Sequence, residues 1–118
     1  MPADNVPKID LGDGSVIHSD GFLEPGVEFT LIVDGESGFK LHDSVLLLDS
    51  RNQAGGGFLA VVRERNVCRL ADVPEEDVRA LGGIDLFHLA EFLRHRNPGL
   101  TWNDLVTVLH LFVFEGEF

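Results

Sequence analysis

Four consecutive aliphatic residues, Val45 to Leu48, do most to limit what this chain can fold into. Turn-forming residues bound the run on both sides, with Gly35 and Gly38 before it and the glycine-rich stretch 52–57 after it. So short a run is typical of a strand buried on both faces, because a helix needs about ten or more residues to offset its nucleation. We therefore expect 45–48 to be the central strand of a small barrel or strongly curved sheet.

The length of 118 residues predicts one domain, 1–118, with a single core. Hydrophobic residues make up 44% of the chain, enough for a core that needs neither disulfides nor metal ions. The single cysteine, Cys68, cannot form an internal disulfide, so we expect an inert buried thiol in a reducing compartment. The polar segment 1–7, with two prolines, is expected to be a flexible N-terminal arm.

The N-terminal region has no cationic flank followed by an apolar segment. No apolar run approaches the roughly 18 residues that a membrane-spanning helix requires. The sequence therefore predicts a cytoplasmic protein with no membrane partner.

The charge of the chain is strongly negative and unevenly distributed. Twenty acidic and nine basic residues give a net charge of −11, which repels phosphate backbones at long range. Residues 1–49 carry a net charge of −8, residues 50–71 carry +3 and residues 72–118 carry −6. Two explanations of the excess of acidic residues are equally good: a functional role, or adaptation to a salt-rich cytoplasm, where acidic residues on the surface maintain solubility.

Alternation and apolar runs predict further strands. Between residues 27 and 33 apolar side chains alternate with Glu28 and Thr30, which indicates a strand with one buried face. The loop 34–38 is expected to make a hairpin-like connection into the 45–48 strand. Two short strands are expected on either side of the Asp13-Gly14 turn. A further strand is expected at 58–65, continuing to 70 after a kink near Asn66. The last strand is expected at 105–114, where it closes the sheet.

Two helices are predicted before that last strand. Asp72 has the position of an N-cap, followed by Pro74 and by acidic residues in the first turn, and Gly82 ends this helix. A second helix begins near Asp85, with apolar residues spaced i, i+3, i+4 and i+7. Its cationic last turn precedes the stop signal at 97–99, Asn-Pro-Gly. The sequence thus predicts an α+β fold.

Several of these segments also follow a family pattern in their order. Gly26 heads the strand 27–33, the segment 39–43 reads Phe-Lys-Leu-His-Asp, residues 97–99 end a helix, and 106–114 is apolar and aromatic. In this order the chain resembles the ASCH domains of the PUA-like superfamily, over about 17–114. The resemblance implies a small mixed β-barrel of about five to six strands with two flanking helices.

The resemblance also implies where an active site would lie. ASCH members similar to bacterial acetylcytidine amide hydrolases use a lysine, a threonine and a glutamate. Here the lysine position holds Glu28, the threonine position falls near Thr30 or Leu31, and the glutamate position falls near Gly82. A glutamate cannot replace a lysine base without a different mechanism. We therefore expect a non-catalytic domain, with Glu28, Thr30 and Lys40 as the site of the alternative, an amide hydrolase acting on N-acylated nucleosides.

The basic residues suggest a binding site. Arg63 and Arg65 are two positions apart, hence on the same side of a strand, and Arg69 follows. Arginine suits phosphates and base edges, and PUA-like domains hold RNA or a modified nucleotide in a groove. We expect Lys40, Arg63, Arg65 and Arg69 to bind RNA or a nucleotide-like ligand. Alternatively, the arginines only neutralise nearby acids, and the acidic faces bind a basic protein partner or a second copy of the chain.

The histidines do not predict a metal site. No His-x-x-x-His pair occurs, and His88 and His95 stand seven positions apart, two turns along a helix. Residues 42–43, His-Asp, occupy the family's Gly-Asp turn, so a turn role is expected there. His110 alternates with apolar neighbours and is expected to be a hydrogen-bonded interior or groove residue. The acidic residues 75–77 are explained by the helix dipole. We expect no metal and no cofactor.

Overall fold

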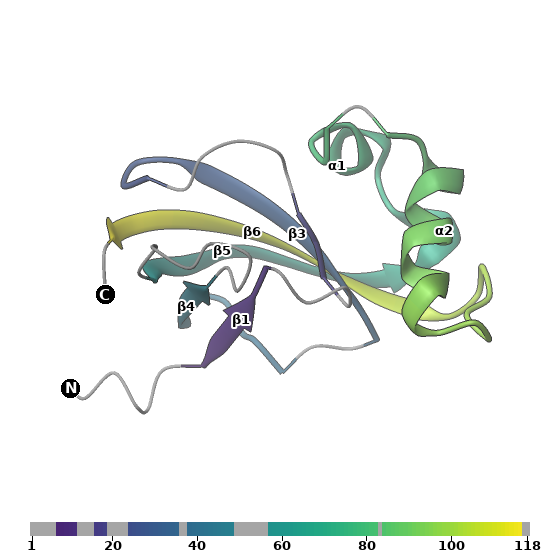
Figure 1. The fold of residues 1–118 in the computed structure, drawn as a ribbon, viewed down its shortest axis with the longest axis horizontal. Coiled ribbons are helices and arrows are strands. Elements are labelled where there is room, and N and C mark those ends of the chain that lie inside the picture. Colours follow the sequence, from purple (N-terminus) through teal and green to yellow (C-terminus); the bar gives the residue numbers. More distant parts are fainter. Residues whose placement is uncertain are drawn as a thin grey trace.

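The computed structural model describes residues 7–11, 16–18, 24–35, 38–48, 57–82 and 84–116. Six strands form one strongly curled sheet, a half-barrel, and two helices lie at one end of it (Figure 1). This arrangement confirms the expected small α+β barrel-like fold with two helices. The elements are β1 (Lys8–Asp10), β2 (Val16–His18), β3 (Glu28–Asp34), β4 (Ser44–Leu48), β5 (Phe58–Arg69), a 3-10 turn (Leu70–Asp72), α1 (Glu75–Arg79), α2 (Leu86–Arg96) and β6 (Leu105–Gly116).

The strands follow the order β1-β4-β5-β6-β3-β2, and every neighbouring pair is antiparallel except β1 and β4. The long strands β5 and β6 are therefore central. The prediction that 45–48 is the central strand is wrong, because β4 lies next to the edge strand β1. Its expected burial is confirmed, since Val45, Leu46 and Leu47 are all buried. An apolar run therefore indicates that both faces of a strand are buried, but it does not indicate where in the sheet the strand lies.

Two expected local connections are replaced by pairing between distant segments. The extended pieces on either side of the Asp13-Gly14 turn do not pair with each other, because β1 pairs with β4 and β2 with β3. The turn itself lies outside the described residues. The strands on either side of the segment 34–38, where a hairpin was expected, do not pair with each other, since β3 pairs with β6 and β4 pairs with β5. Turn-forming residues mark where the chain reverses, but they do not specify which strands become neighbours.

Strand β5 is longer and more irregular than expected. It continues from Phe58 to Arg69 without a kink at Asn66. Its register against β6 shifts instead between Leu59 and Ala60 and again between Val62 and Glu64. A β-bulge adds one residue to a strand and re-aims the side chains beside it. The second shift leaves Arg63 as the extra residue, and this decides where the following side chains point.

The sheet carries an apolar cluster on each face, and alternate residues of β6 contribute to both. We call the cluster inside the curl the barrel core and the cluster beneath the helices the helix core. This division explains why 105–114 is almost wholly apolar, because a strand covered on both faces needs no polar side. Representative members are Leu31, Leu47, Val62, Leu109 and Leu111 in the barrel core, and Ile32, Val78, Leu89, Leu93 and Val108 in the helix core.

The first helix, α1, is shorter than predicted and begins later. Asp72 is not its N-cap, because residues 70–72 form a 3-10 turn and the helix is preceded by Pro74, which makes no side-chain cap. The Asp72 carboxylate instead contacts the Arg69 guanidinium at 2.8 Å. Asp72 thus contacts Arg69, the residue immediately before the turn, and does not cap the helix.

The second helix, α2, agrees with the prediction. Asp85 is its N-cap and accepts a hydrogen bond from the backbone N–H of His88 at 2.9 Å. Leu89, Ala90 and Leu93 are buried as the expected core-facing stripe, and the helix ends before Asn97. Within the described residues, neither helix has the length or apolar character needed to span a bilayer.

Both helices belong to a long excursion between β5 and β6 whose two ends meet. The Leu70 N–H donates to the Asp104 carbonyl at 2.9 Å, and the Ala71 N–H donates to the Trp102 carbonyl at 3.0 Å. Beside them, Arg69 of β5 is paired with Leu105 of β6. The excursion is therefore closed at its base, and the helices are placed over one end of the sheet.

Candidate functional site

A small hollow of about 210 Å³ opens where β3, β5 and β6 run side by side. Strand alternation places Glu28 and Thr30 of β3 on the same face, and Thr30 is the direct register partner of His110 on β6. The hollow thus brings together two of the predicted catalytic candidates and one predicted ligand-binding residue, Arg63. Its lining is formed by Glu28, Phe29, Thr30, Arg63, Glu64, His110 and Leu111.

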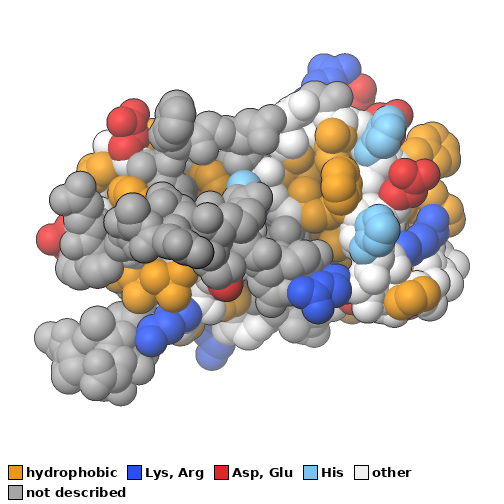
Figure 2. All heavy atoms as spheres, in the orientation of Figure 1, with side chains coloured by type: hydrophobic (Ala, Val, Ile, Leu, Met, Phe, Trp, Pro, Cys, Tyr) orange, Lys and Arg blue, Asp and Glu red, His pale blue; other side chains and the backbone are white. Residues whose placement is uncertain are grey.

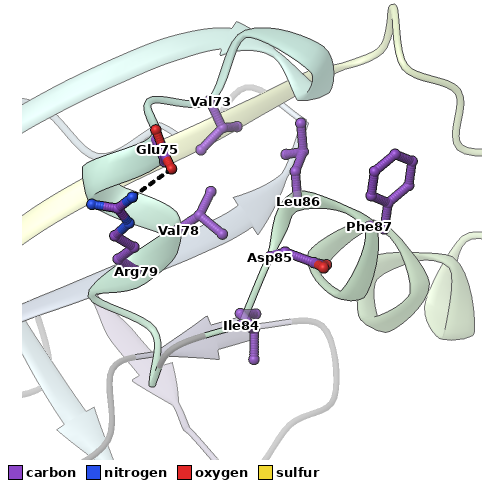
Figure 3. Close-up of a pocket in the computed structure, with 8 residues that line it drawn as sticks. All are labelled: Val73, Glu75, Val78, Arg79, Ile84, Asp85, Leu86 and Phe87. Atoms are coloured by element: carbon purple, nitrogen blue, oxygen red, sulfur yellow. Dashed lines mark hydrogen bonds and ion pairs between the residues drawn. The ribbon is translucent and has the colours of Figure 1, made fainter.

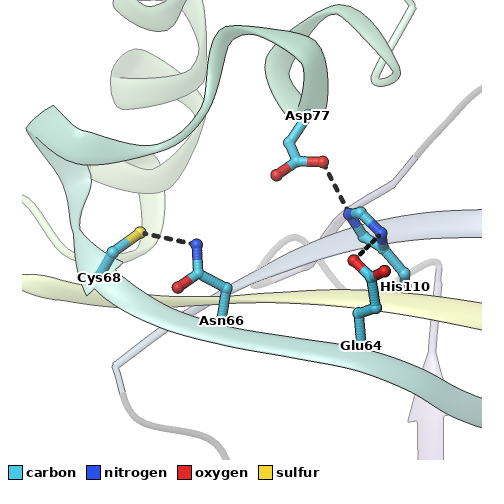
Figure 4. Close-up of polar contacts among 5 residues, drawn as sticks. All are labelled: Glu64, Asn66, Cys68, Asp77 and His110. Atoms are coloured by element: carbon cyan, nitrogen blue, oxygen red, sulfur yellow. Dashed lines mark hydrogen bonds and ion pairs between the residues drawn. The ribbon is translucent and has the colours of Figure 1, made fainter.

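The imidazole of His110 is held between two carboxylates from different elements (Figure 4). Its Nε2 lies 2.7 Å from Asp77 Oδ1 on α1, and its Nδ1 lies 3.1 Å from Glu64 Oε2 on β5. The Asp77 contact is a hydrogen bond, and the Glu64 contact is an ion-pair distance. The expectation of a hydrogen-bonded groove residue is confirmed, and the two contacts fix the orientation of the ring.

Asp77 is the site residue that the sequence interpretation missed. It was assigned to the helix dipole together with its acidic neighbours, but its side chain is only 9% exposed and faces His110. Glu75 and Glu76 are exposed, and Glu75 instead contacts Arg79 at 2.7 Å. The available signal was the position of Asp77 four residues before Leu81, on the apolar side of α1. A carboxylate on a buried face requires a polar partner.

Arg63 and Arg65 do not lie on the same side of β5, contrary to the prediction. The Arg63 guanidinium stands 4.3 Å from the centroid of the Phe112 ring. Arg65 is paired with Leu109, a barrel-core residue, and therefore stems from the opposite face. The bulge after Val62 explains the difference, because the two-residue period on which the prediction rested fails across an inserted residue.

The other two predicted basic residues also lie apart from the hollow. Arg69 is at the far end of β5, where the hydrogen bond to Asp72 raises its guanidinium pKa. Lys40 is exposed in the turn that precedes β4, and its backbone N–H donates to Asp43 Oδ2 at 2.9 Å. Among the four predicted ligand-binding residues, only Arg63 lines the hollow.

The turn role expected for residues 42–43 is confirmed by the backbone. His42 has a φ of +70°, in the left-handed region that favours glycine. Its N–H donates to the Val62 carbonyl at 2.8 Å, which holds the turn against β5. A non-glycine residue in this conformation costs about 1–2 kcal/mol.

Cys68 lies on β5 but is not equipped as a nucleophile. The thiol is half-buried, and burial is the main cause that raises its pKa, followed by the negative charges of Asp72 and Asp77. The Asn66 amide points at the sulfur from 3.8 Å (Figure 4). A raised pKa keeps the thiol protonated, whereas nucleophilic chemistry requires the thiolate.

The described residues contain no group of three His, Cys, Asp or Glu side chains arranged to hold a metal ion. The hollow is smaller than the roughly 300–1,000 Å³ pockets that bury drug-sized ligands, so it suits a single ring. Comparison of the chain with protein-family models, curated proteins and solved structures finds no match. The function of the hollow is therefore inferred from its own geometry.

Proposed function

We propose that this chain is a non-catalytic, ASCH-like domain that binds a nucleoside-like ligand, with the base in the hollow formed by β3, β5 and β6. The supporting observation is that His110, held between Asp77 and Glu64, stands beside Thr30 and Arg63 in one concave site. Ring-sized ligands are recognised by a few polar groups at fixed positions, and base edges offer matching donors and acceptors.

A single nucleoside fits this site better than an extended RNA. Binding along an RNA backbone requires a continuous cationic track. Lys40, Arg65 and Arg69 do not line the hollow, and two of the lining side chains, Glu28 and Glu64, are acidic. A phosphate chain would meet these carboxylates, whereas an uncharged base could donate hydrogen bonds to them.

Calorimetric titration with the four common ribonucleosides tests this proposal. Arg63→Ala and Thr30→Val each alter the hollow, and we expect each to weaken binding of the preferred nucleoside at least about tenfold. Arg65→Ala and Arg69→Ala are matched controls, because they remove the same charge from the same strand outside the hollow, and they should leave the affinity unchanged.

Two results would contradict the proposal. One is the absence of heat with all four nucleosides at millimolar concentration. The other is equal loss of binding in the Arg63 variant and the Arg65 control. If a single-stranded RNA binds instead, with an affinity that falls steeply with salt and needs Arg65 and Arg69, the extended RNA interpretation is correct.

A second candidate function is an amide hydrolase acting on N-acylated nucleosides. The observation that favours it is that Glu28 and Thr30 line the same hollow as His110. Its weakness is that both ring nitrogens of His110 already face carboxylates, and Lys40 lies elsewhere. Release of free cytidine from N-acetylcytidine by the protein, lost in Glu28→Ala, would establish this function in place of simple binding.

A further inference from the structure

A second pocket, of about 500 Å³, lies between α1 and the first turn of α2 (Figure 3). Its volume falls within the roughly 300–1,000 Å³ typical of sites for small organic molecules. It is separate from the hollow described above, because Asp77 on α1 faces His110 whereas its neighbour Val78 faces this pocket. The pocket is lined by Val73, Glu75, Val78, Arg79, Ile84, Asp85, Leu86 and Phe87.

The inner walls of this pocket are apolar and firmly placed. Val73 and Val78 are buried members of the helix core, and Leu86 packs against the same cluster (Figure 3). At the mouth, Phe87 is 70% exposed and meets the Trp102 ring edge-on, with 5.7 Å between centroids. Figure 2 shows hydrophobic side chains exposed at the helical end of the molecule, beside acidic and histidine side chains.

The charged groups of the lining give the pocket an excess of one negative charge. Arg79 and Glu75 form an ion pair with 2.7 Å between guanidinium and carboxylate, so they balance each other. Asp85 is the second carboxylate of the lining; it is 62% exposed, and its Oδ1 contacts the His88 Nδ1 at 2.8 Å. The pKa of Asp85 is lowered, chiefly by the backbone hydrogen bond from His88, so this carboxylate stays ionised at neutral pH.

We propose that this pocket binds a small apolar molecule that bears one primary amine. The apolar body packs against Val73, Val78 and Leu86, and the ammonium group lies at the mouth beside Asp85. The ring of Phe87 covers the bound body from the solvent side. This ligand class follows from the apolar walls together with the exposed Asp85 carboxylate, which has no lysine or arginine partner among the lining residues, and it is independent of the nucleoside site.

Three probes with one adamantane body test the charge preference: 1-adamantanemethylamine, 1-adamantanemethanol and 1-adamantanecarboxylate. Trp102 reports binding, because the sequence contains one tryptophan and no tyrosine, and the probes do not absorb where it does. We expect the amine to bind about 1.5- to 5-fold more tightly than the alcohol, the range for one exposed ion pair, and the carboxylate to bind more weakly than the alcohol. Methyl NMR signals of Val73, Val78 and Leu86 should shift with all probes that bind.

The variant Asp85→Asn removes the carboxylate at the mouth and leaves the Arg79–Glu75 pair intact, while asparagine keeps the helix N-cap. Its affinity for the amine should drop to that for the alcohol, and its affinity for the alcohol should stay unchanged. Glu91→Gln is the matched control, since it removes an exposed carboxylate from α2 outside this pocket and should preserve the preference.

Three outcomes would overturn the proposal. The first is a carboxylate probe that binds as tightly as the amine. The second is the absence of any Trp102 or methyl response to all three probes. The third is a Trp102 spectrum that changes with protein concentration while light scattering gives a mass above one chain, which would assign the pocket to a second copy.

Discussion

Asp77 Oδ1 on α1 lies 2.7 Å from His110 Nε2 on β6, so a buried carboxylate joins the helical end of the molecule to the central strand of its sheet. Because α1 is short, this contact does much to hold it in place. Helix α1 also links the hollow to the second pocket, since Asp77 orients His110 in the hollow and Val78 forms a wall of the pocket. Changes in α1 are therefore expected to affect both sites.

Removing the Asp77 carboxylate should destabilise the fold more than removing that of Glu64. Hydrogen bonds to charged groups contribute about 1.5–3 kcal/mol, so Asp77→Ala is expected to lower the free energy of unfolding by that amount. Glu64 is 74% exposed, and Glu64→Ala should cost less than about 1 kcal/mol. Urea titration measures both, and Glu76→Ala corrects for the helix propensity of alanine in α1. Equal decreases in the free energy of unfolding for the Asp77 and Glu64 variants would contradict the prediction that the buried contact is the more stabilising one.

The left-handed backbone at His42 reverses the usual order of alanine and glycine. His42→Gly should be more stable to urea than His42→Ala by about 1 kcal/mol, because glycine adopts positive φ without steric cost. At Glu91, an exposed position within α2, the same two substitutions should show the opposite order, with glycine about 1 kcal/mol less stable. A common order at both positions would contradict the left-handed conformation of His42.

Asp85 should make the stability of the protein depend on pH in the acid range. Its pKa is lowered in the folded state from the ordinary value of 3.8, chiefly by the His88 backbone hydrogen bond. Its contribution is therefore complete above that ordinary value and is lost as the pH falls through the lower folded pKa. Asp85→Asn keeps the cap but does not titrate, so the stability difference between wild type and variant should shrink on acidification. Thermal unfolding from about pH 6 to about pH 2 measures this, and a constant difference would exclude the effect.

The Cys68 thiol should react slowly with alkylating reagents. Its pKa is raised above 9.0 by burial and by the nearby carboxylates of Asp72 and Asp77, so the thiolate fraction at neutral pH is small. Iodoacetamide should modify the folded chain more slowly than the urea-unfolded chain, and the rate should reach half its maximum above pH 9.0. In Asp72→Asn this midpoint should shift downward. A folded-state rate equal to the unfolded one would show that the thiol is not shielded.

Features that are decided by neighbouring residues could be predicted from the sequence. The second helix has its cap, its apolar stripe and its stop signal within one continuous segment, and each appears as expected from Asp85 to Asn97. The nearly unbroken apolar run after Leu105 likewise predicts a strand, and β6 runs from Leu105 to Gly116, although it lies between β5 and β3 and does not close the sheet.

Features that depend on distant segments could not be predicted. The pairing of β3 with β6 joins opposite ends of the chain, and nothing in either strand encodes the other. A single bulge after Val62 turns Arg63 and Arg65 to opposite faces, although their spacing in sequence is that of neighbours on one face. The buried role of Asp77 emerges only once His110 is known to lie opposite it.

The segment between Leu70 and Asp104, closed at its base, matters little for strand connectivity but much for the burial of the sheet. In connectivity the helical segment is an insert in a β-hairpin, because β5 and β6 would remain antiparallel neighbours with a short turn in its place. For stability, however, the segment is essential, because its removal would expose Ile32, Val106 and Val108 on one face of the sheet. A chain that lacks this segment would therefore keep its strand order but expose an apolar face of the sheet. Such a chain is expected to self-associate through that face.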